Sequence, residues 1–190
     1  MQIAPRPPKV FPDDRDFSPH LDAVRTAPAE GGLVEHIVLR PAVDQRVIAS
    51  HAELDVVEGV VGDTWRVRGS SRTPDGLGHP DSQVTLMSTR VLAAIEPDVS
   101  RWPLAGDQLL VDADLSVATW PAGTRFAIGT AVLEVSEMPH TGCAKFSARF
   151  GSDALRWINS PTGRELRMRG MNATIIESGT VRVGDAIRRA

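Results

Sequence analysis

From residue 32 onward, short apolar or alternating runs are separated by glycine, proline and aspartate. Runs of roughly four to eight residues bounded by turn residues predict β-strands. We expect strands at residues 33–39, 63–68, 83–87, 171–176, 180–183 and 185–188, with two more inside 126–135 joined around Gly129-Thr130. Helical spacing of apolar residues predicts helices at 88–95 and 147–158, and a short one near 20–26.

Many short strands and few helices predict a mainly β protein of the α+β class. We expect a barrel or a curled sheet with helices on it, rather than a doubly wound parallel sheet. Residues 1–31 differ from the rest because they hold 6 of the 14 prolines. Proline disfavours helix interiors and central strands, so this segment is expected to be an arm on a body formed by residues 32–190.

Composition narrows the classes of function. Hydrophobic residues make up 42% of the 190 residues, charged residues 24%, and the net charge is −3. This charge gives no general attraction to nucleic acid or to an anionic membrane. No apolar run approaches the roughly 20 residues that span a bilayer, and the N-terminus lacks a secretory pattern. We therefore expect a cytoplasmic protein without nucleic-acid or membrane partners, in an oligomeric state that the sequence leaves open.

The chain has one cysteine, Cys143. A single thiol excludes an intrachain disulfide framework, a zinc finger, a CxxC redox motif and an iron–sulfur cluster held by this chain. The glycine patterns of nucleotide-binding loops, the HExxH and GxSxG motifs and pairs of histidines at zinc-site spacing are also absent. Cys143 could be a buried inert thiol, a nucleophile, a sulfur carrier or one ligand to a cofactor metal.

The neighbours of Cys143 favour a chemical role. Pro139 and Gly142 interrupt regular pairing after the strand, which places Cys143 in a loop near the start of the next helix. His140, Lys145 and Arg149 are close in sequence. Cations and a helix N-terminus favour the thiolate, the form that attacks or ligates. The alternative is that Cys143 is a small buried hydrophobe.

Three further segments are weaker candidates. The polar loop at 68–80 offers Arg72 and His79 as anion contacts, although a solvated loop explains it equally well. Alternation would place Arg167 and Arg169 on one face of a strand, where a solvated face is the common explanation. Gly-Asp recurs at 62–63, 106–107 and 184–185, and each pair is interpreted as a turn that leads into a strand.

Taken in order, six segments between residues 33 and 188 resemble a MOSC domain, the C-terminal module of molybdenum cofactor sulfurases that also occurs alone in bacteria. The segments are 58–65, 83–87, 104–109, 128–135 with the cysteine loop, 169–173 and 179–185. The resemblance implies a MOSC-type β-barrel with a pocket and makes Cys143 the counterpart of the family's functional cysteine. Many members have Arg-x-Pro-Cys where this chain has Pro139-His140-Thr141-Gly142-Cys143, so His140 could replace that arginine.

Three alternative functions stand, of which the resemblance implies the first two. In the first, Cys143 ligates the molybdenum of a pterin cofactor, His140 moves protons, and the protein reduces N-hydroxylated compounds with a redox partner. In the second, Cys143 carries a persulfide between a sulfur donor and an acceptor protein. In the third, the domain only binds an anion. The expected cofactor contacts are Arg72, His79, Thr141, Lys145, Arg149, Arg169 and Asn172. The chain has no counterpart of the desulfurase domain of full sulfurases, so no pyridoxal phosphate is expected.

Overall fold

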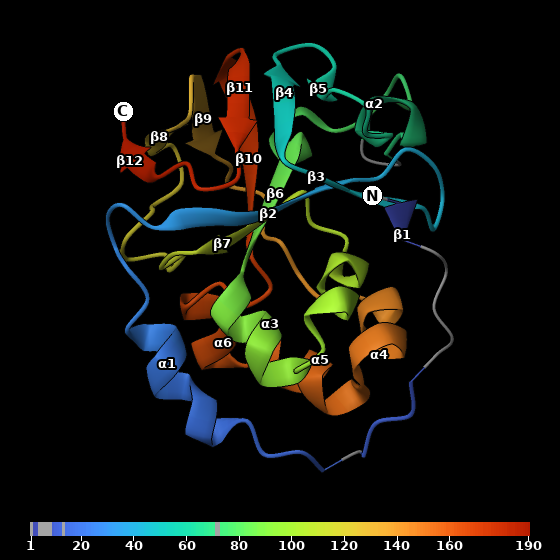
Figure 1. The fold of residues 1–190 in the computed structure, drawn as a ribbon, viewed down its shortest axis with the longest axis vertical. Helices are drawn as coiled ribbons and strands as arrows, with labels where there is room; N and C mark the ends of the chain where they lie inside the picture. The colour runs from blue at the N-terminus through green and yellow to red at the C-terminus, as the bar shows by residue number, and fades with distance from the viewer. Residues whose placement is uncertain (1, 4–8, 13, 71–72) are drawn as a thin grey trace.

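A computed structural model describes residues 2–3, 9–12, 14–70 and 73–190. In these residues one large sheet lies against a layer of short helices (Figure 1). The strands are β1 Gln2–Ile3, β2 Leu33–Leu39, β3 Arg46–Ala49, β4 His51–Asp55, β5 Gly59–Val60, β6 Val84–Ser88, β7 Leu109–Asp112, β8 Arg125–Ile128, β9 Ala131–Val135, β10 Met171–Glu177, β11 Gly179–Arg182 and β12 Ile187–Arg189. The α-helices are α1 Leu21–Arg25, α2 Trp65–Arg68, α3 Thr89–Ile95, α4 Ala144–Phe150, α5 Ser152–Ile158 and α6 Pro161–Glu165. Three 3-10 helices are η1 Ser18–His20, η2 Pro80–Ser82 and η3 Val99–Ala105.

The fold is mixed α+β and mainly β, as predicted. The large sheet has the order β1-β3-β2-β7-β6-β10-β9-β8-β12, and β6 and β7 pair in parallel. A second sheet has the order β11-β4-β5. Within the described residues the large sheet is open, with β1 and β12 at its edges, so the closed barrel is not confirmed. An isolated bridge between Leu33 and Ala186 brings the β12 end against the start of β2 without forming a paired ladder there.

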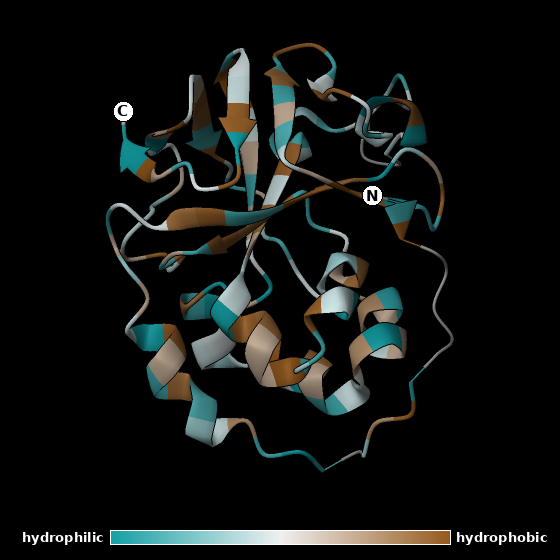
Figure 2. Cartoon of the chain, viewed as in Figure 1, coloured by the Kyte–Doolittle hydropathy of each residue, from teal (hydrophilic) through white to brown (hydrophobic). Residues whose placement is uncertain are grey.

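Both faces of the central strands are buried, and they face different cores. Ile37 and Leu86 point into a cluster inside the curled sheet, whereas their neighbours Val38 and Met87 point into a cluster shared with the helices. Successive side chains of a strand point to opposite faces, so a strand between two apolar layers is apolar at every position. Brown apolar segments accordingly run along the central strands and along the helices below them (Figure 2).

Most predicted elements are confirmed. Strands occur at the predicted places in 33–39, 83–87, 126–135, 171–176 and 180–183, and helices near 20–26 and at 88–95. The final strand begins at Ile187, two residues later than predicted. Among the described residues, no helix is both long enough and apolar enough to cross a bilayer.

Two predicted elements are wrong. The alternating segment 63–68 forms the helical turn α2, because a carboxylate oxygen of Asp63 accepts a hydrogen bond from the Trp65 backbone N–H at 2.8 Å and starts a turn. The single helix expected at 147–158 is two helices, α4 and α5, which are separated at Gly151. Gly151 has φ +98°, a conformation that ends one helix and redirects the chain into the next.

Candidate functional site

The loop between β9 and α4 places Cys143 at the N-cap position of α4. Side-chain amides hold this loop at two points. The Asn172 amide donates to the Met138 carbonyl oxygen at 3.1 Å, and the Asn159 carbonyl oxygen accepts from the Gly142 N–H at 3.2 Å. The loop is thus fixed on both sides of the segment that leads to the thiol.

Beside this loop lies a cavity of about 380 Å³, a volume typical of small-ligand sites. Seven residues expected from the sequence line it: His140, Thr141, Cys143, Lys145, Arg149, Arg169 and Asn172. Three arginines that were not expected also line it: Arg40, Arg46 and Arg68. The structure therefore brings the predicted residues of the cysteine loop together with cations from β2, β3 and α2.

The Cys143 side chain is exposed, so the interpretation as a buried inert thiol is wrong. Partial burial raises its pKa, but the backbone N–H groups of Phe146 and Lys145 and the charges of Arg169 and Arg149 outweigh burial and bring the pKa below 9.0. Cys143 makes no side-chain cap hydrogen bond to α4, so the effect of these amides is electrostatic. The shift is in the direction of the thiolate.

Three cations of the cavity have carboxylate partners. Arg40 pairs with Asp63 at 2.7 Å. Arg149 pairs with Asp44 at 3.0 Å, although Asp44 is largely exposed to solvent. The third pair joins Arg169 to Asp107, which lies behind the cavity wall.

Three other cations have no carboxylate partner among the described residues: Arg46, Arg68 and Lys145. Arg46 is buried, and its guanidinium donates only to backbone carbonyl oxygens of Pro103 and Gln45. Burial and the nearby positive charges of Arg149 and Arg40 lower the pKa of Arg46 to about 10, which leaves it charged at neutral pH. Uncompensated positive charge in a cavity favours an anionic ligand.

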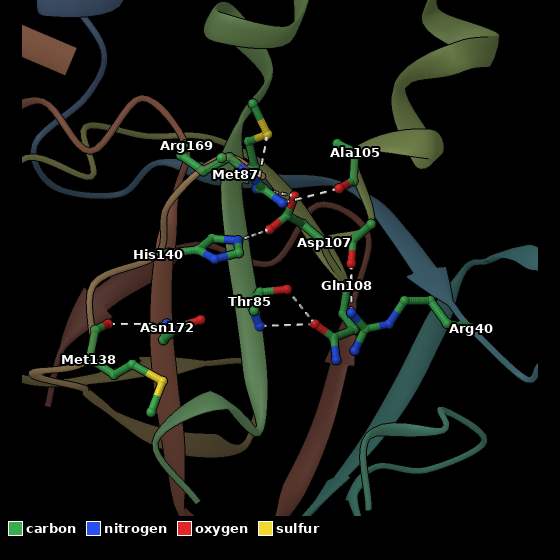
Figure 3. Close-up of polar contacts among 12 residues, drawn as sticks. Arg40, Thr85, Met87, Ala105, Asp107, Gln108, Met138, His140, Arg169 and Asn172 are labelled. Carbon is green, nitrogen blue, oxygen red and sulfur yellow. Dashed lines mark hydrogen bonds and ion pairs between the residues drawn. The ribbon is translucent and has the colours of Figure 1, made fainter. Parts of the chain in front are cut away.

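A buried carboxylate joins the cysteine loop to this wall. Asp107 is fully buried; its Oδ1 lies 2.7 Å from Nε2 of His140, and its Oδ2 accepts from Nη1 of Arg169 at 2.7 Å (Figure 3). Burial raises the pKa of Asp107, but the charges and hydrogen bonds of Arg169 and His140 bring it down to about 2. Burial and the charge of Arg169 lower the pKa of His140, and the opposing effect of Asp107 is smaller.

Arg169 lies in the segment that leads into β10 and is itself buried. It also donates to the Ala105 carbonyl oxygen at 3.1 Å, and its guanidinium lies 5.1 Å from the centre of the Phe146 ring. Gly170 (φ +106°) permits this path, because an added Cβ would collide with the Leu86 carbonyl oxygen. Nε of Arg169 is buried without a hydrogen-bond partner in the described part of the chain. Buried N–H groups are normally hydrogen-bonded, so this group can donate to an acceptor on a bound ligand.

The structure corrects the expected placement of Arg167 and Arg169. Both precede β10, so they do not share a face of a strand. Arg167 has a positive φ of 44° and donates to the Trp120 carbonyl oxygen at 2.6 Å. The irregular backbone sends the two guanidinium groups to different partners.

Two expected contacts stand apart from the cavity. His79 is not among its lining residues; Nδ1 of His79 accepts from the Asp81 N–H at 3.2 Å, and the residue caps η2. This contact gives His79 a structural role in its own loop. Arg72 lies outside the described residues.

A second cavity of about 430 Å³ lies beside the same loop. Both cavities share six lining residues: Met138, Pro139, His140, Thr141, Arg169 and Asn172. His140 and Arg169 are the titratable residues of this common wall. The His140 side chain therefore borders both cavities.

Sequence reasoning missed Asp107 and the arginines Arg40, Arg46 and Arg68. Asp107 was interpreted as a turn residue. The sequence indicates its burial only through the apolar residues on either side, at 104–105 and 109–110. A carboxylate buried there needs a cation as its partner. The arginines carry no local signal, because the chain brings them to the cavity from distant elements. Among the described residues, no group of three His, Cys, Asp or Glu side chains is arranged to hold a metal ion.

The fold and the site define a class: a small α+β domain with one exposed cysteine at an arginine-rich cavity. The sequence profile of the MOSC domain matches residues 73–188, more than half of the chain, so this chain belongs to the MOSC domain family. No curated protein sequence matches it.

Solved structures share the fold. YiiM from Escherichia coli has a TM-score of 0.55 and 19% identity, over 83% of this chain and 69% of that one. The YuaD protein from Bacillus subtilis has a TM-score of 0.53 and 17% identity, over 82% of this chain and 93% of that one. YiiM from Geobacillus stearothermophilus has a TM-score of 0.52 and 13% identity, over 86% of this chain and 74% of that one. At these identities the comparison establishes the fold alone.

Proposed function

We propose that this MOSC domain binds a molybdenum pterin cofactor through Cys143 and reduces N-hydroxylated compounds in the cytoplasm, with electrons from a redox partner. MOSC domains are known in molybdenum cofactor-binding proteins. The observation that carries the proposal is the pairing of an exposed, acidified thiol with three cations that have no carboxylate partner in the described chain.

The donor set fits this cofactor. A thiolate is a soft ligand that suits a thiophilic metal, and a pterin dithiolene would supply the other sulfurs. Cys143 lines the cavity as a single soft donor, so the arrangement that it supports is a metal with one protein ligand. When bound, the cofactor supplies a redox centre that exchanges electrons with a small substrate.

The chain's own residues would hold the phosphate of the pterin. Arg46, Arg68 and Lys145 offer positive charge and form no ion pair within the described residues, and Arg149 and Arg169 line the same cavity. Arginine recognises phosphate through two donors at once, whereas lysine contributes a point charge. Nε of Arg169, buried and unpartnered, is a donor that a bound ligand can satisfy.

The test is the molybdenum and pterin content of protein purified from a host that makes the cofactor. We expect about one molybdenum per chain and little in Cys143→Ser, because the variant loses the soft ligand. Lys145→Gln should retain less cofactor, while Lys9→Gln, at the chain's other lysine, should retain the wild-type amount. Wild-type protein without molybdenum would overturn the proposal, and reduction of an N-hydroxylated amidine by loaded protein tests the activity.

A second function, a persulfide carrier, is favoured by the exposure of the Cys143 thiol. A carrier needs a nucleophilic thiolate that partner proteins can reach. Cyanide would take the outer sulfur of the persulfide as thiocyanate and leave the thiolate. Release of about one thiocyanate per wild-type chain and none from Cys143→Ser would support this function. Equal release from both would exclude it.

A further inference from the structure

The two oxygens of Asp107 are divided between His140 and Arg169. We propose that Asp107 is a positioning residue that holds His140 as the neutral Nε2–H tautomer, so that Nδ1 of His140 is the proton acceptor of the cavity.

The first step concerns the direction of the hydrogen bond. Asp107 is fully buried beside the Arg169 guanidinium, which donates to its Oδ2. A carboxylate paired with a permanent cation is ionised at neutral pH and can only accept. The 2.7 Å contact with His140 therefore requires a proton on Nε2 of the histidine.

The second step concerns the charge of the imidazole. Three charged groups act on His140: Asp107 and Arg169 directly, and Arg40 from the end of β2. Only Asp107 favours the imidazolium, while both arginines and burial disfavour it. With a proton on Nε2 and no net charge, the ring carries its lone pair on Nδ1.

The third step concerns what Nδ1 faces. Nδ1 of His140 has no hydrogen-bond partner among the residues the structure describes, and its ring edge lies away from Asp107 (Figure 3). His140 lines both cavities, and its side chain is 17% exposed. A molecule in either cavity can thus present a proton to this nitrogen.

The arrangement follows the logic of a carboxylate that orients a general base. A proton leaves an O–H, N–H or S–H group of a molecule in the cavity and binds Nδ1, and the donor atom keeps the electron pair. Asp107 stabilises the imidazolium, which returns the proton to the product or to water. The inference rests on the proposed function only for the identity of the proton donor, since the tautomer is a property of the protein without cofactor.

The direct test is nitrogen NMR of the histidine side chains in the full chain, without cofactor, at neutral pH. The two ring nitrogens have distinct signals in each tautomer, and the exposed His20 provides a reference in the same spectrum. We expect His140 to be neutral with its proton on Nε2. A proton on Nδ1, or an imidazolium, would overturn the proposal even if the protein binds molybdenum.

The variant Asp107→Asn tests the cause. Arg169 can only donate, so the new amide oxygen should face Arg169 and the amide NH₂ should face Nε2 of His140. Nε2 then becomes an acceptor, and the proton should move to Nδ1. The matched control is Asp44→Asn, which removes a carboxylate that lines the cavity and does not contact His140. If Asp107→Asn keeps the proton on Nε2, Asp107 does not set the tautomer; if that variant does not fold, the wild-type spectrum decides.

Discussion

Cys143 owes its chemistry to groups that lie on both sides of it. The first turn of α4 presents backbone N–H groups to the thiol, and Arg169 and Arg149 add positive charge from the cavity wall. These effects oppose partial burial, which favours the neutral thiol. The sequence shows only the neighbours along the chain; Arg169 is 26 positions away and reaches the site through the fold.

The alkylation of Cys143 by iodoacetamide should therefore follow a thiolate with a lowered pKa. We expect the rate to rise with pH around a midpoint lower than that of the same thiol in the urea-unfolded chain. Arg149→Gln removes one of the stabilising cations, so its midpoint should lie higher than that of the wild type. Arg25→Gln, on α1 outside the cavity, should leave the midpoint unchanged. A native midpoint equal to or above that of the unfolded chain would contradict this description of the thiol.

Asp107 makes stability depend on pH in a defined direction. Its native pKa of about 2 is below the value of about 3.9 in an unfolded chain, so folding favours the ionised form. This contribution is present above about pH 4 and is lost as the pH falls through about 2. Its size is on the order of 2 kcal/mol at neutral pH.

Urea unfolding measured between neutral pH and pH 3 checks this prediction. The free energy of unfolding of the wild type should fall as acid is added, and Asp107→Asn should show a smaller fall over the same range, since it has no carboxylate to protonate. Asp44→Asn should behave like the wild type, because Asp44 is exposed. Equal acid dependence in Asp107→Asn and wild type would show that other groups are responsible.

Among the secondary-structure elements, the break between α4 and α5 has the clearest physical cause. Gly151 has φ +98°, and a Cβ there would lie 2.6 Å from Oδ1 of Asp153 and 2.7 Å from Nη2 of Arg15. Apolar spacing continues through this position, which is why the pattern predicts one helix over 147–158. Periodicity reports which residues are buried, and it does not report a change of direction between two short helices that bury the same face.

Gly151→Ala should destabilise the protein by about 2–4 kcal/mol, because it adds backbone strain and also displaces the Arg15–Asp153 ion pair. Gly123→Ala is the control, since Gly123 also has a positive φ (+81°) but nothing lies near an added Cβ. That variant should cost about 1 kcal/mol through strain alone. Denaturant unfolding of both gives the difference, and equal losses would mean that contacts at Gly151 contribute nothing.

The strands were more predictable than the helices. Turn residues mark both ends of β2, β8, β9 and β10. The central strands are also recognisable as continuous apolar runs, because they face two cores. The strand predicted at 63–68 is wrong because Asp63 accepts from the Trp65 N–H at the start of a helical turn and pairs with Arg40, a partner 23 positions away. Local alternation cannot reveal such a contact.

In the whole molecule, the N-terminal segment is tied to the helical layer. The Arg15 guanidinium donates to both carboxylate oxygens of Asp153, at 2.8 and 2.9 Å, and to the carbonyl oxygens of Ile95 and Phe150. Lys9 pairs with the buried Glu96 at 2.7 Å. The division of the chain at residue 31 stays a prediction. The ion pairs of Arg15 and Lys9 attach the N-terminal segment to the helical layer.

Arg15→Ala should lower the free energy of unfolding by about 2–4 kcal/mol, because it leaves the buried carboxylate of Asp153 without its cation. It should also speed proteolysis within the first residues of the chain. Arg25→Ala, on the exposed face of α1, should change neither by a measurable amount. Unchanged proteolysis in Arg15→Ala would mean that this ion pair does not hold the arm.

The cavity is a product of the whole fold. Arg40 and Arg46 flank the turn between β2 and β3, Arg68 ends α2, and the cysteine loop follows β9. Sequence reasoning could predict the loop because its residues are consecutive, and seven of the nine predicted site residues line the cavity. It could not predict Arg46 or Asp107. Both lie far along the chain from the cysteine loop, and only the folded sheet brings them close to it.

The most direct measurement is X-ray absorption at the molybdenum edge, on the wild type and Cys143→Ser purified from a host that makes the cofactor. The proposed ligation predicts a molybdenum signal in the wild type with one more sulfur neighbour than in any metal the variant retains. Absence of molybdenum from the wild type, or an identical sulfur shell in both proteins, would contradict Cys143 as the ligand.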